Sequence, residues 1–284
     1  MTDTEASPSG GDYREDLADL AEYEFRAAQT LCADCAEYHG LWGYGRLAGI
    51  NNGVAMDADI MAPALRRLAF RGDRILIAGA ADAGLLSLVA EATGDAKPDI
   101  TIADRCETPL AVCRHYAQAH GLAIATLRTE LADGPLDGRY DLILAHNLLL
   151  FIPAPVRSAL LRNLAQALSD KGRLMLVVGM ASPQQGGAAR AQYRDHAGLL
   201  EALRLRGIPL PEAESEFRRR IASLAEAWRA RRAIILDRSA IETSLSAAGL
   251  RLVETIEHSR RRTLAGEDEA APVPTCAFIA SAST

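Results

Sequence analysis

Five short apolar runs, most of them followed by a helical pattern, constrain the fold of this chain more than any other feature. The runs lie at residues 74–80, 99–104, 123–129, 140–146 and 173–179. Near-continuous apolar strands that alternate with helices are typical of a parallel sheet with helices on both faces. The third run differs, because the loop LADGPLDG follows it in place of a long helix. We therefore predict an α/β fold built around a mostly parallel sheet.

The C-terminal part adds two further strands to this prediction. Apolar runs at 250–258 and 275–282 follow the helical pattern SAIETSLSAAG, and the polar loop RRRTLAGEDEAAPVP separates them. Two strands that are joined by a loop without a crossover helix are most simply antiparallel neighbours. The predicted sheet therefore has seven strands and ends in an antiparallel C-terminal strand.

Two helical regions accompany the predicted sheet. Residues 1–12 lack apolar periodicity and are expected to be a disordered tail. Residues 13–70 are predicted to form an N-terminal helical cap, in which the glycines and asparagines of 41–54 break the first helix. Residues 71–284 then form the α/β domain, with a helical insert at 183–232.

Composition and charge exclude several classes of protein. Of the 284 residues, 49% are apolar and 24% are charged, which is ordinary for a packed globular chain. No apolar run is long enough to span a membrane, and the acidic N-terminus is unlike a signal peptide. The net charge of −6 and the lack of a basic stripe with interleaved aromatics argue against a nucleic-acid partner. We expect a cytoplasmic protein without nucleic-acid or membrane partners.

The cysteines raise the question of a metal site. Cys32 and Cys35 form a C-x-x-C motif, and His39 follows it. A zinc or iron–sulfur site needs a fourth ligand, and no second C-x-x-C supplies one. The segment EYEFRAAQTLCADCAEYHGL reads as one helix with both sulfurs toward the core, so we predict no metal. The remaining cysteines are expected to be scattered buried thiols: Cys106, Cys113 and Cys276.

Two features at strand ends point to a ligand. The first run ends in AGAADAG, which includes Gly79, Ala80 and Ala81. Small residues at a strand-to-helix turn let a ligand lie against the backbone, although a tight turn alone also needs them. The second run ends in Asp104, at roughly the distance from the turn where nucleotide-binding folds place a ribose-binding acid. The alternative is that Asp104 caps the next helix.

Four segments taken together resemble the motifs of the class I S-adenosylmethionine (SAM)-dependent methyltransferases. They are RILIAGAADAG, ITIAD, RYDLILAHNLLLF and SDKGRLMLVV, and the likeness covers about residues 70–180 and 236–284. The resemblance implies a seven-stranded, Rossmann-like methyltransferase sheet and SAM as the cofactor. The chain departs from the family pattern at the first motif, where alanines fill the middle of the usual G-x-G-x-G loop and Ile77 stands near the usual acid.

The resemblance also implies which residues contact SAM. The expected cofactor contacts are Gly79, Ala80, Ala81, Asp104, Arg105, Thr129, Glu130, Leu131, His146, Asn147 and Tyr44. His146 and Asn147 are the candidate catalytic residues, His146 as a base or as a contact only. The Asn-Pro-Pro-aromatic signature for nucleobase amino groups is absent, and His146-Asn147 stands in its place.

Residues outside the sheet are candidates for a lid over the ligand. An aromatic face near a sulfonium is a favourable cation–π arrangement, so Tyr44 is expected at SAM, with Trp42 and Arg46 at the substrate. The alternative is that Trp42 and Tyr44 pack the cap onto the core. In the insert, Tyr193 and His196 share one face of the predicted helix and are further substrate candidates.

The leading hypothesis is a methyltransferase for a small-molecule oxygen or nitrogen acceptor, acting by in-line displacement. Such a reaction depends on positioning, desolvation and loss of a proton from the acceptor. Two alternatives use the same fold. One is a SAM-using cyclase or aminocarboxypropyl transferase, and the other is a SAM-binding module without catalysis. A homodimer is compatible with the sequence.

Overall fold

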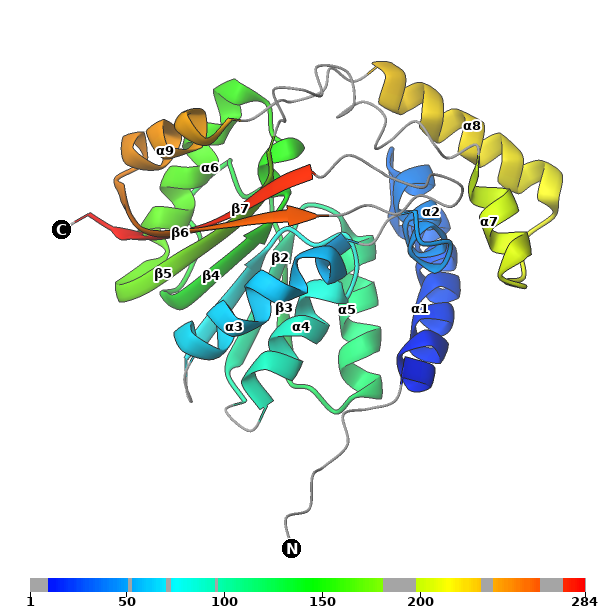
Figure 1. Ribbon diagram of the computed structural model, residues 1–284, viewed down its shortest axis with the longest axis horizontal. Helices are drawn as coiled ribbons and strands as arrows, with labels where there is room; N and C mark the ends of the chain where they lie inside the picture. The colour runs from blue at the N-terminus through cyan, green and yellow to red at the C-terminus, as the bar shows by residue number, and fades with distance from the viewer. Residues whose placement is uncertain are drawn as a thin grey trace, which may run out of the picture.

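The central feature of the computed structural model is a seven-stranded sheet with the order β3-β2-β1-β4-β5-β7-β6 (Figure 1). The structure describes residues 10–50, 53–69, 73–94, 97–180, 198–230, 237–260 and 273–283. The strands are β1 (Arg74–Ala78), β2 (Asp99–Asp104), β3 (Ile124–Arg128), β4 (Tyr140–His146), β5 (Leu168–Gly179), β6 (Leu250–Arg260) and β7 (Val273–Ala282). All seven predicted strands are present.

Strand direction follows the prediction as well. β3, β2, β1, β4 and β5 pair in parallel, and β7 runs antiparallel to both β5 and β6. The predicted antiparallel pair is therefore confirmed. The chain order reverses between β1 and β4, which is the switch point where open α/β sheets bind ligands beyond the carboxyl ends of their strands.

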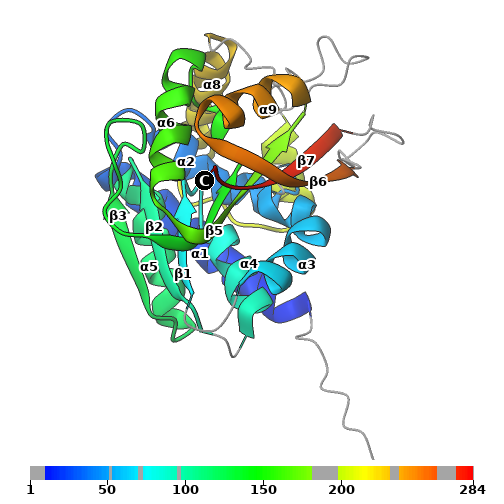
Figure 2. The same ribbon diagram turned by 90° about the vertical axis from the view of Figure 1, so that its left-hand side faces the viewer.

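Helices cover both faces of the sheet because its strands are apolar on both sides. Leu76 and Ala78 of β1 face one core and Ile75 and Ile77 face the other. Figures 1 and 2 place α6 and α9 on the first face, and α3, α4 and α5 on the second. These helices are α3 (Ala58–Leu68), α4 (Gly84–Thr93), α5 (Glu107–Ala119), α6 (Ala154–Gln166) and α9 (Arg238–Ala247).

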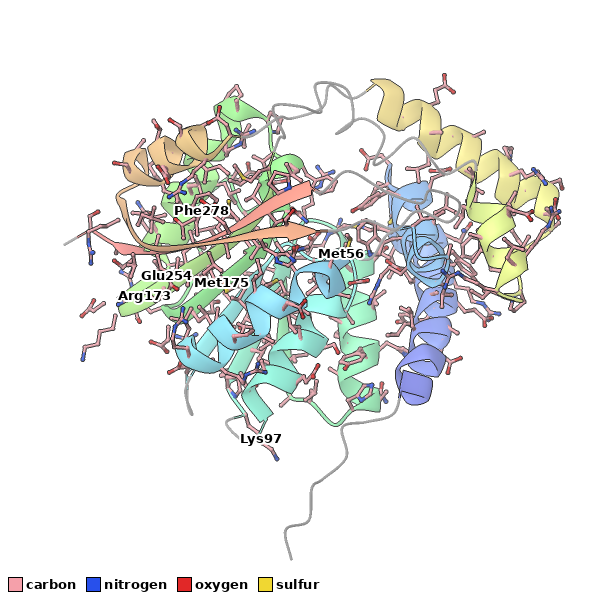
Figure 3. All side chains as sticks on the ribbon, viewed as in Figure 1. Met56, Lys97, Arg173, Met175, Glu254 and Phe278 are labelled. Atoms are coloured by element: carbon pink, nitrogen blue, oxygen red, sulfur yellow. The ribbon has the colours of Figure 1, made fainter. Side chains whose placement is uncertain are left out.

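Side chains of the paired strands β5 and β7 illustrate the two cores (Figure 3). Phe278 of β7 lies among the side chains of α6 and α9, and Met175 of β5 lies among those of α3 and α4. Both are fully buried. Lys97, which lies in the connection between α4 and β2, extends away from the sheet (Figure 3).

A third apolar core holds the helical cap together beside the sheet. It joins α1 (Gly10–Leu31), α2 (Ala36–Leu47), α7 (Leu199–Leu205) and α8 (Glu214–Ala230), which gather on one side of the molecule in Figure 1. The cap is thus built from the N-terminal region together with part of the predicted insert. One further short helix, η1 (Gly53–Asp57), leads from the cap into α3.

The predicted helix break at 41–54 is placed wrongly at its start. α1 ends at Leu31, residues 32–35 are irregular, and α2 then continues through Gly40 and Gly43 to Leu47. The glycines are contact positions, because a Cβ at Gly43 would lie 2.7 Å from the Cα of Ala21 in α1. Missing side chains let the two helices pack backbone to backbone, so tertiary packing outweighs the low helix propensity of glycine.

Replacing Gly43 by alanine should therefore destabilise the protein by about 1–3 kcal/mol, because the added methyl group must displace the backbone of α1. Gly40 provides a matched control in the same helix. Its Cβ would meet Ala28 and Phe25 at an ordinary 3.6 Å, so Gly40→Ala should be neutral or stabilising. Urea unfolding of both variants measures the difference, and equal effects would contradict the proposed role of Gly43.

Some predicted features lie outside the described residues. These are residues 1–9 of the predicted tail, after which α1 begins at Gly10, and the substrate candidates Tyr193 and His196. The described part of the predicted insert, 198–230, contains α7 and α8 and no strand. Among the described residues, no helix combines the length and apolar character needed to cross a membrane.

Candidate functional site

Helix α2 lies against three loops that follow strands of the sheet. Its Trp42 contacts the loop after β1, its His39 contacts the loop after β2, and its Tyr38 contacts Phe151 after β4. These loops leave the carboxyl ends of strands on both sides of the switch point. The cap is therefore anchored at the edge of the sheet where a ligand is expected.

The turn after β1 brings the backbone close to this edge. Gly79 has a positive φ of 79°, a conformation that side chains other than glycine rarely adopt. A Cβ at this position would lie 2.8 Å from Cδ1 of Leu148, which follows β4. Its amide donates a 2.8 Å hydrogen bond to the carbonyl of Ala103 in β2. The left-handed backbone thus favours glycine here even before any ligand is considered.

Asp104 lies beside that turn. One carboxylate oxygen accepts a 3.0 Å hydrogen bond from the amide of Ala80, and the other accepts a 2.7 Å bond from the amide of Cys106. Burial raises the pKa of Asp104, while the bonds from Cys106 and Ala80 act in the opposite direction. The N-cap residue of α5 is Cys106, so Asp104 lies before the cap and bridges the loops after β1 and β2.

The candidates in the loops after β2 and β3 differ in their surroundings. Thr129 is brought next to Asp104, since its amide donates a 2.9 Å bond to the Asp104 carbonyl. Leu131 is buried in the core shared with α6, and its carbonyl accepts a bond from Asn163. Glu130 is half-buried, and Arg105 is exposed. Their contacts with SAM stay predictions.

His146 ends β4 and pairs with a residue that the sequence did not single out. Its Nε2 lies 2.7 Å from a carboxylate oxygen of Asp57, which is fully buried. Asp57 occupies the N-cap position of α3 but makes no capping bond there, so its side chain is available to His146. An ionised Asp57 keeps a proton on Nε2 and leaves Nδ1 as the ring atom that can accept one.

Asn147 fixes the same strand end. It has a left-handed backbone with φ of 55°, and its side-chain oxygen accepts a 2.9 Å bond from the amide of Gly179. Its backbone amide donates a 2.7 Å hydrogen bond to the carbonyl of Val177. The residue therefore joins the ends of β4 and β5 beside His146, and a further role toward a ligand stays a prediction.

Trp42 and Arg46 both reach Asp82 in the turn after β1. The indole Nε1 of Trp42 donates a 3.0 Å bond to one oxygen of Asp82, and Arg46 forms an ion pair with the same oxygen. The other oxygen accepts a 2.8 Å bond from the amide of Gly84 at the start of α4. These contacts tie α2 to the turn, and the predicted substrate contacts of Trp42 and Arg46 stay untested.

Tyr44 lies in the core of the cap. Its ring is edge-on to Phe25, at 6.0 Å between centroids, and to Phe217 of α8, at 5.5 Å. The side chain is buried, and burial raises the pKa of its hydroxyl to about 12. This placement favours the packing role of Tyr44 over the contact with a sulfonium.

The cysteines depart from the prediction. The chain does not continue as one helix through Cys32 and Cys35, and Cys106 is no isolated thiol, because it lies 3.6 Å from each of those sulfurs. A hydrogen bond from Cys32, with a contribution from His39, lowers the pKa of Cys106 to about 3. Although burial opposes it, hydrogen bonds to Cys106 and Cys35 raise the pKa of His39 to about 10.

Comparisons with known proteins bear on the fold. No family model and no curated protein sequence matches the chain. Among solved structures, it is similar to the magnesium protoporphyrin IX methyltransferase of Synechocystis PCC 6803 with bound SAH, at 16% identity and a TM-score of 0.52, over 97% of this chain and 100% of that one.

Two other solved structures give the same result. The SAM-dependent methyltransferase SibL in its apo form is 16% identical, with a TM-score of 0.54 over 95% of this chain and 70% of that one. A SAM-dependent methyltransferase from Clostridium acetobutylicum ATCC 824 is 10% identical, with a TM-score of 0.51 over 85% and 96%. Together with the strand order, these similarities show that the chain has the Rossmann-like fold of the class I SAM-dependent methyltransferases.

Proposed function

We propose that this protein is a SAM-dependent methyltransferase that acts on an oxygen or nitrogen atom of a small molecule. The observation that carries the proposal is the half-buried carboxylate of Asp104, which accepts a hydrogen bond from the turn after β1. In this fold, that is the position from which an acid accepts hydrogen bonds from ribose hydroxyls. The structural neighbour from Synechocystis holds SAH and, in a second structure, SAM.

The residues at this edge fit such a cofactor. Each carboxylate oxygen of Asp104 accepts one hydrogen bond from a backbone amide. A carboxylate oxygen can accept a second hydrogen bond, for example from a ribose hydroxyl. Gly79, Ala80 and Ala81 keep bulky side chains away from the turn. We assign Asp104 to the ribose, and the backbone of the turn to the adjoining part of SAM. When bound, SAM supplies an electrophilic methyl group.

His146 is the proposed base. An oxygen or nitrogen acceptor loses a proton as it attacks, and a positioned base that takes the proton speeds such a step by about 10²–10⁴-fold. Asp57 orients the imidazole through Nε2 and offsets the positive charge that the ring gains on accepting a proton at Nδ1. Asp57 is therefore a positioning residue, while Asn147 fixes the strand end from which His146 projects.

A small acceptor agrees with the cap and with the charge of the chain. α2 reaches the loops after β1, β2 and β4, so it restricts access to the same edge that holds Asp104 and His146. The net charge of −6 does not favour a polyanionic acceptor. We therefore propose an acceptor that is small enough to be enclosed between the cap and the sheet.

Thermal unfolding with candidate cofactors tests the proposal. SAM and SAH should each raise the melting temperature, because a ligand that binds only the folded state stabilises it by mass action, whereas NAD should not. A shift with NAD alone would contradict the assignment of the site. Product analysis separates the rival enzyme class: methyl transfer leaves S-adenosylhomocysteine, whereas attack on the aminocarboxypropyl carbon leaves methylthioadenosine.

A further inference from the structure

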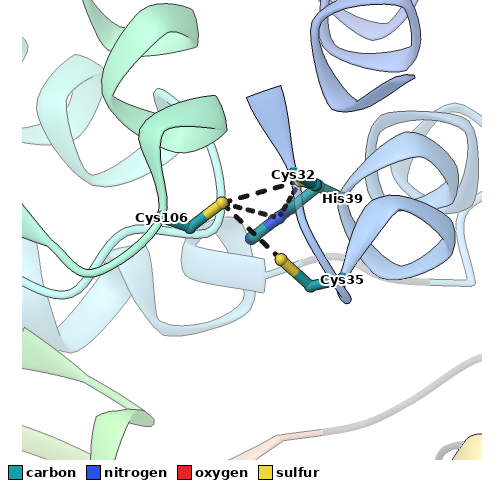
Figure 4. A group of neighbouring side chains, drawn as sticks. All are labelled: Cys32, Cys35, His39 and Cys106. Atoms are coloured by element: carbon teal, nitrogen blue, oxygen red, sulfur yellow. Dashed lines mark hydrogen bonds between the residues drawn. The ribbon is translucent and has the colours of Figure 1, made fainter. Parts of the chain in front are cut away.

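Four side chains that are distant in sequence converge where the cap meets the α/β domain. Cys32 follows α1, Cys35 and His39 lie at the start of α2, and Cys106 precedes α5. Their sulfur atoms and a ring nitrogen of His39 all lie within 4.8 Å of one another. Figure 4 shows the three thiol groups directed toward the imidazole and toward each other.

Four of the distances between these atoms are close to those of ligands around a single zinc ion, and every pair lies within 4.8 Å. With Zn–S bonds of about 2.3 Å and Zn–N bonds of about 2.0 Å, a tetrahedral site has S–S edges of about 3.8 Å and S–N edges of about 3.5 Å. Cys106 Sγ lies 3.6 Å from the sulfurs of both Cys32 and Cys35. His39 Nδ1 lies 3.2 Å from Cys32 Sγ and 3.5 Å from Cys106 Sγ.

The surroundings also suit a closed structural site. His39 and Cys106 are buried, while Cys32 and Cys35 are half-buried, which leaves a route for a metal to enter. The hydroxyl of Thr108, itself fully buried, lies 3.0 Å from Cys32 Sγ. A hydroxyl that donates to a thiolate ligand is a common outer contact of metal sites, because it orients the sulfur.

Other uses of the four residues fit the geometry less well. Terminal ligands of an iron–sulfur cluster are held further apart, because several irons and bridging sulfides lie between them. Any disulfide would join only two of the three sulfurs, although Cys106 lies 3.6 Å from both of the others, and it would leave the third thiol and the imidazole without a function.

We propose that Cys32, Cys35, His39 and Cys106 bind one zinc ion in a closed tetrahedral site that joins the cap to the loop after β2. As three Zn–S bonds and one Zn–N bond form, three protons leave to solvent, two from the thiols of Cys32 and Cys35 and one from the Cys106–His39 pair. No oxidation state changes, and the site holds three thiolates and one neutral imidazole. Because all four positions are taken by protein ligands, the role of the zinc is structural. The missing fourth ligand of the C-x-x-C motif is thus supplied from the α/β domain.

The site would act on the loop that bears Asp104. The amide of Cys106 donates to Asp104 at 2.7 Å, so a metal on the Cys106 sulfur also fixes the position of that carboxylate. An effect of zinc on SAM binding rests on the proposed function, but the zinc site itself does not. Metal content and SAM affinity therefore report on the two proposals separately.

Metal analysis of the full chain, purified without a histidine tag, tests the proposal. Elemental mass spectrometry should find about one zinc per chain, as expected for a mononuclear site. Cys32→Ala and Cys106→Ala should reduce the zinc content to background. Cys113→Ala and Cys276→Ala are matched controls, because both remove buried cysteines outside the cluster, and they should retain the zinc.

Wild-type protein provides a second measurement that does not depend on how the variants fold. After removal of the metal by a chelator, titration with Co²⁺ should give the intense visible bands of a tetrahedral site together with thiolate-to-cobalt charge transfer, saturating at one equivalent. His39→Ala should change these bands. Zinc added afterwards should displace the cobalt and abolish the colour.

Each of the following results would overturn the proposal. Iron together with acid-labile sulfide, in place of zinc, would indicate an iron–sulfur cluster. Absence of metal with fewer than the five thiols of the sequence titrating in unfolded protein would indicate a disulfide. Zinc that is retained at the wild-type level by Cys106→Ala would place the metal elsewhere. If zinc is absent but SAM still raises the melting temperature, the zinc site is refuted and the proposed function stands.

Discussion

Replacing His146 by alanine should lower the turnover number by about 10²–10⁴-fold while SAM affinity changes little, because the variant removes the proposed base and leaves Asp104 in place. The rate is measured as S-adenosylhomocysteine release with an acceptor identified from a panel of hydroxyl and amine compounds. His120 at the end of α5 gives a control, since it is an exposed histidine at the opposite edge of the sheet, and His120→Ala should keep full activity.

A double mutant then separates orientation of His146 from a purely structural role of Asp57. Asp57→Asn should lower the turnover number in the wild-type background, because the imidazole loses its charged partner. In the His146→Ala background the same change should have no further effect on turnover, since Asp57 then has no base to orient. Losses that multiply in the double mutant would contradict the positioning role of Asp57.

For the single variant His146→Ala, a loss of SAM affinity equal to the loss of rate would show that His146 is a cofactor contact and not a base.

Replacing Asp104 by alanine should weaken SAM binding at least tenfold, about 1.4 kcal/mol, because two ribose hydroxyls lose a charged acceptor. Isothermal titration well below the melting temperature measures this affinity. The variant also removes the acceptor for the amides of Ala80 and Cys106, so a loss of stability of about 1 kcal/mol is expected as well. Unchanged affinity would show that Asp104 only connects the two loops.

Asp141 is the matched control for this experiment. Its carboxylate also accepts a backbone amide, that of Arg74, together with the hydroxyl of Ser169. These bonds, chiefly the one from Arg74, lower the pKa of Asp141. Asp141 lies near the beginning of β4, at the edge of the sheet opposite to the candidate site. Asp141→Ala should therefore lower the stability of the protein without weakening the binding of SAM.

The sheet could be predicted from sequence because each strand carries its own local signal. The apolar runs at 99–104 and 140–146 coincide with β2 and β4, and most of their side chains are apolar and buried, with Thr101 and Asp141 as the polar exceptions inside them. Asp104 and His146 were found for a related reason. Each is the polar residue that ends such a run, and the carboxyl ends of neighbouring parallel strands meet at one edge.

The partners of these residues carry no such local signal. Asp57 meets His146 across 89 residues, and Cys32 meets Cys106 across 74, so both contacts form only once distant segments of the chain are packed against the sheet. The irregular segment at 32–35 was missed because its neighbours on both sides have helical patterns. The opposite error at Gly43 arose because glycine was taken as a helix breaker where it serves helix packing.

The position of β7 between β5 and β6 sets an order on how the chain can be assembled during translation. Strands leave the ribosome in sequence order, so β6 is complete before β7, its only hydrogen-bonded neighbour in the described sheet, has been made. Until then the edge of β5, which is apolar on both faces, also lacks its second partner. Two strand edges that are prone to association therefore stay open until β7 takes its place between them.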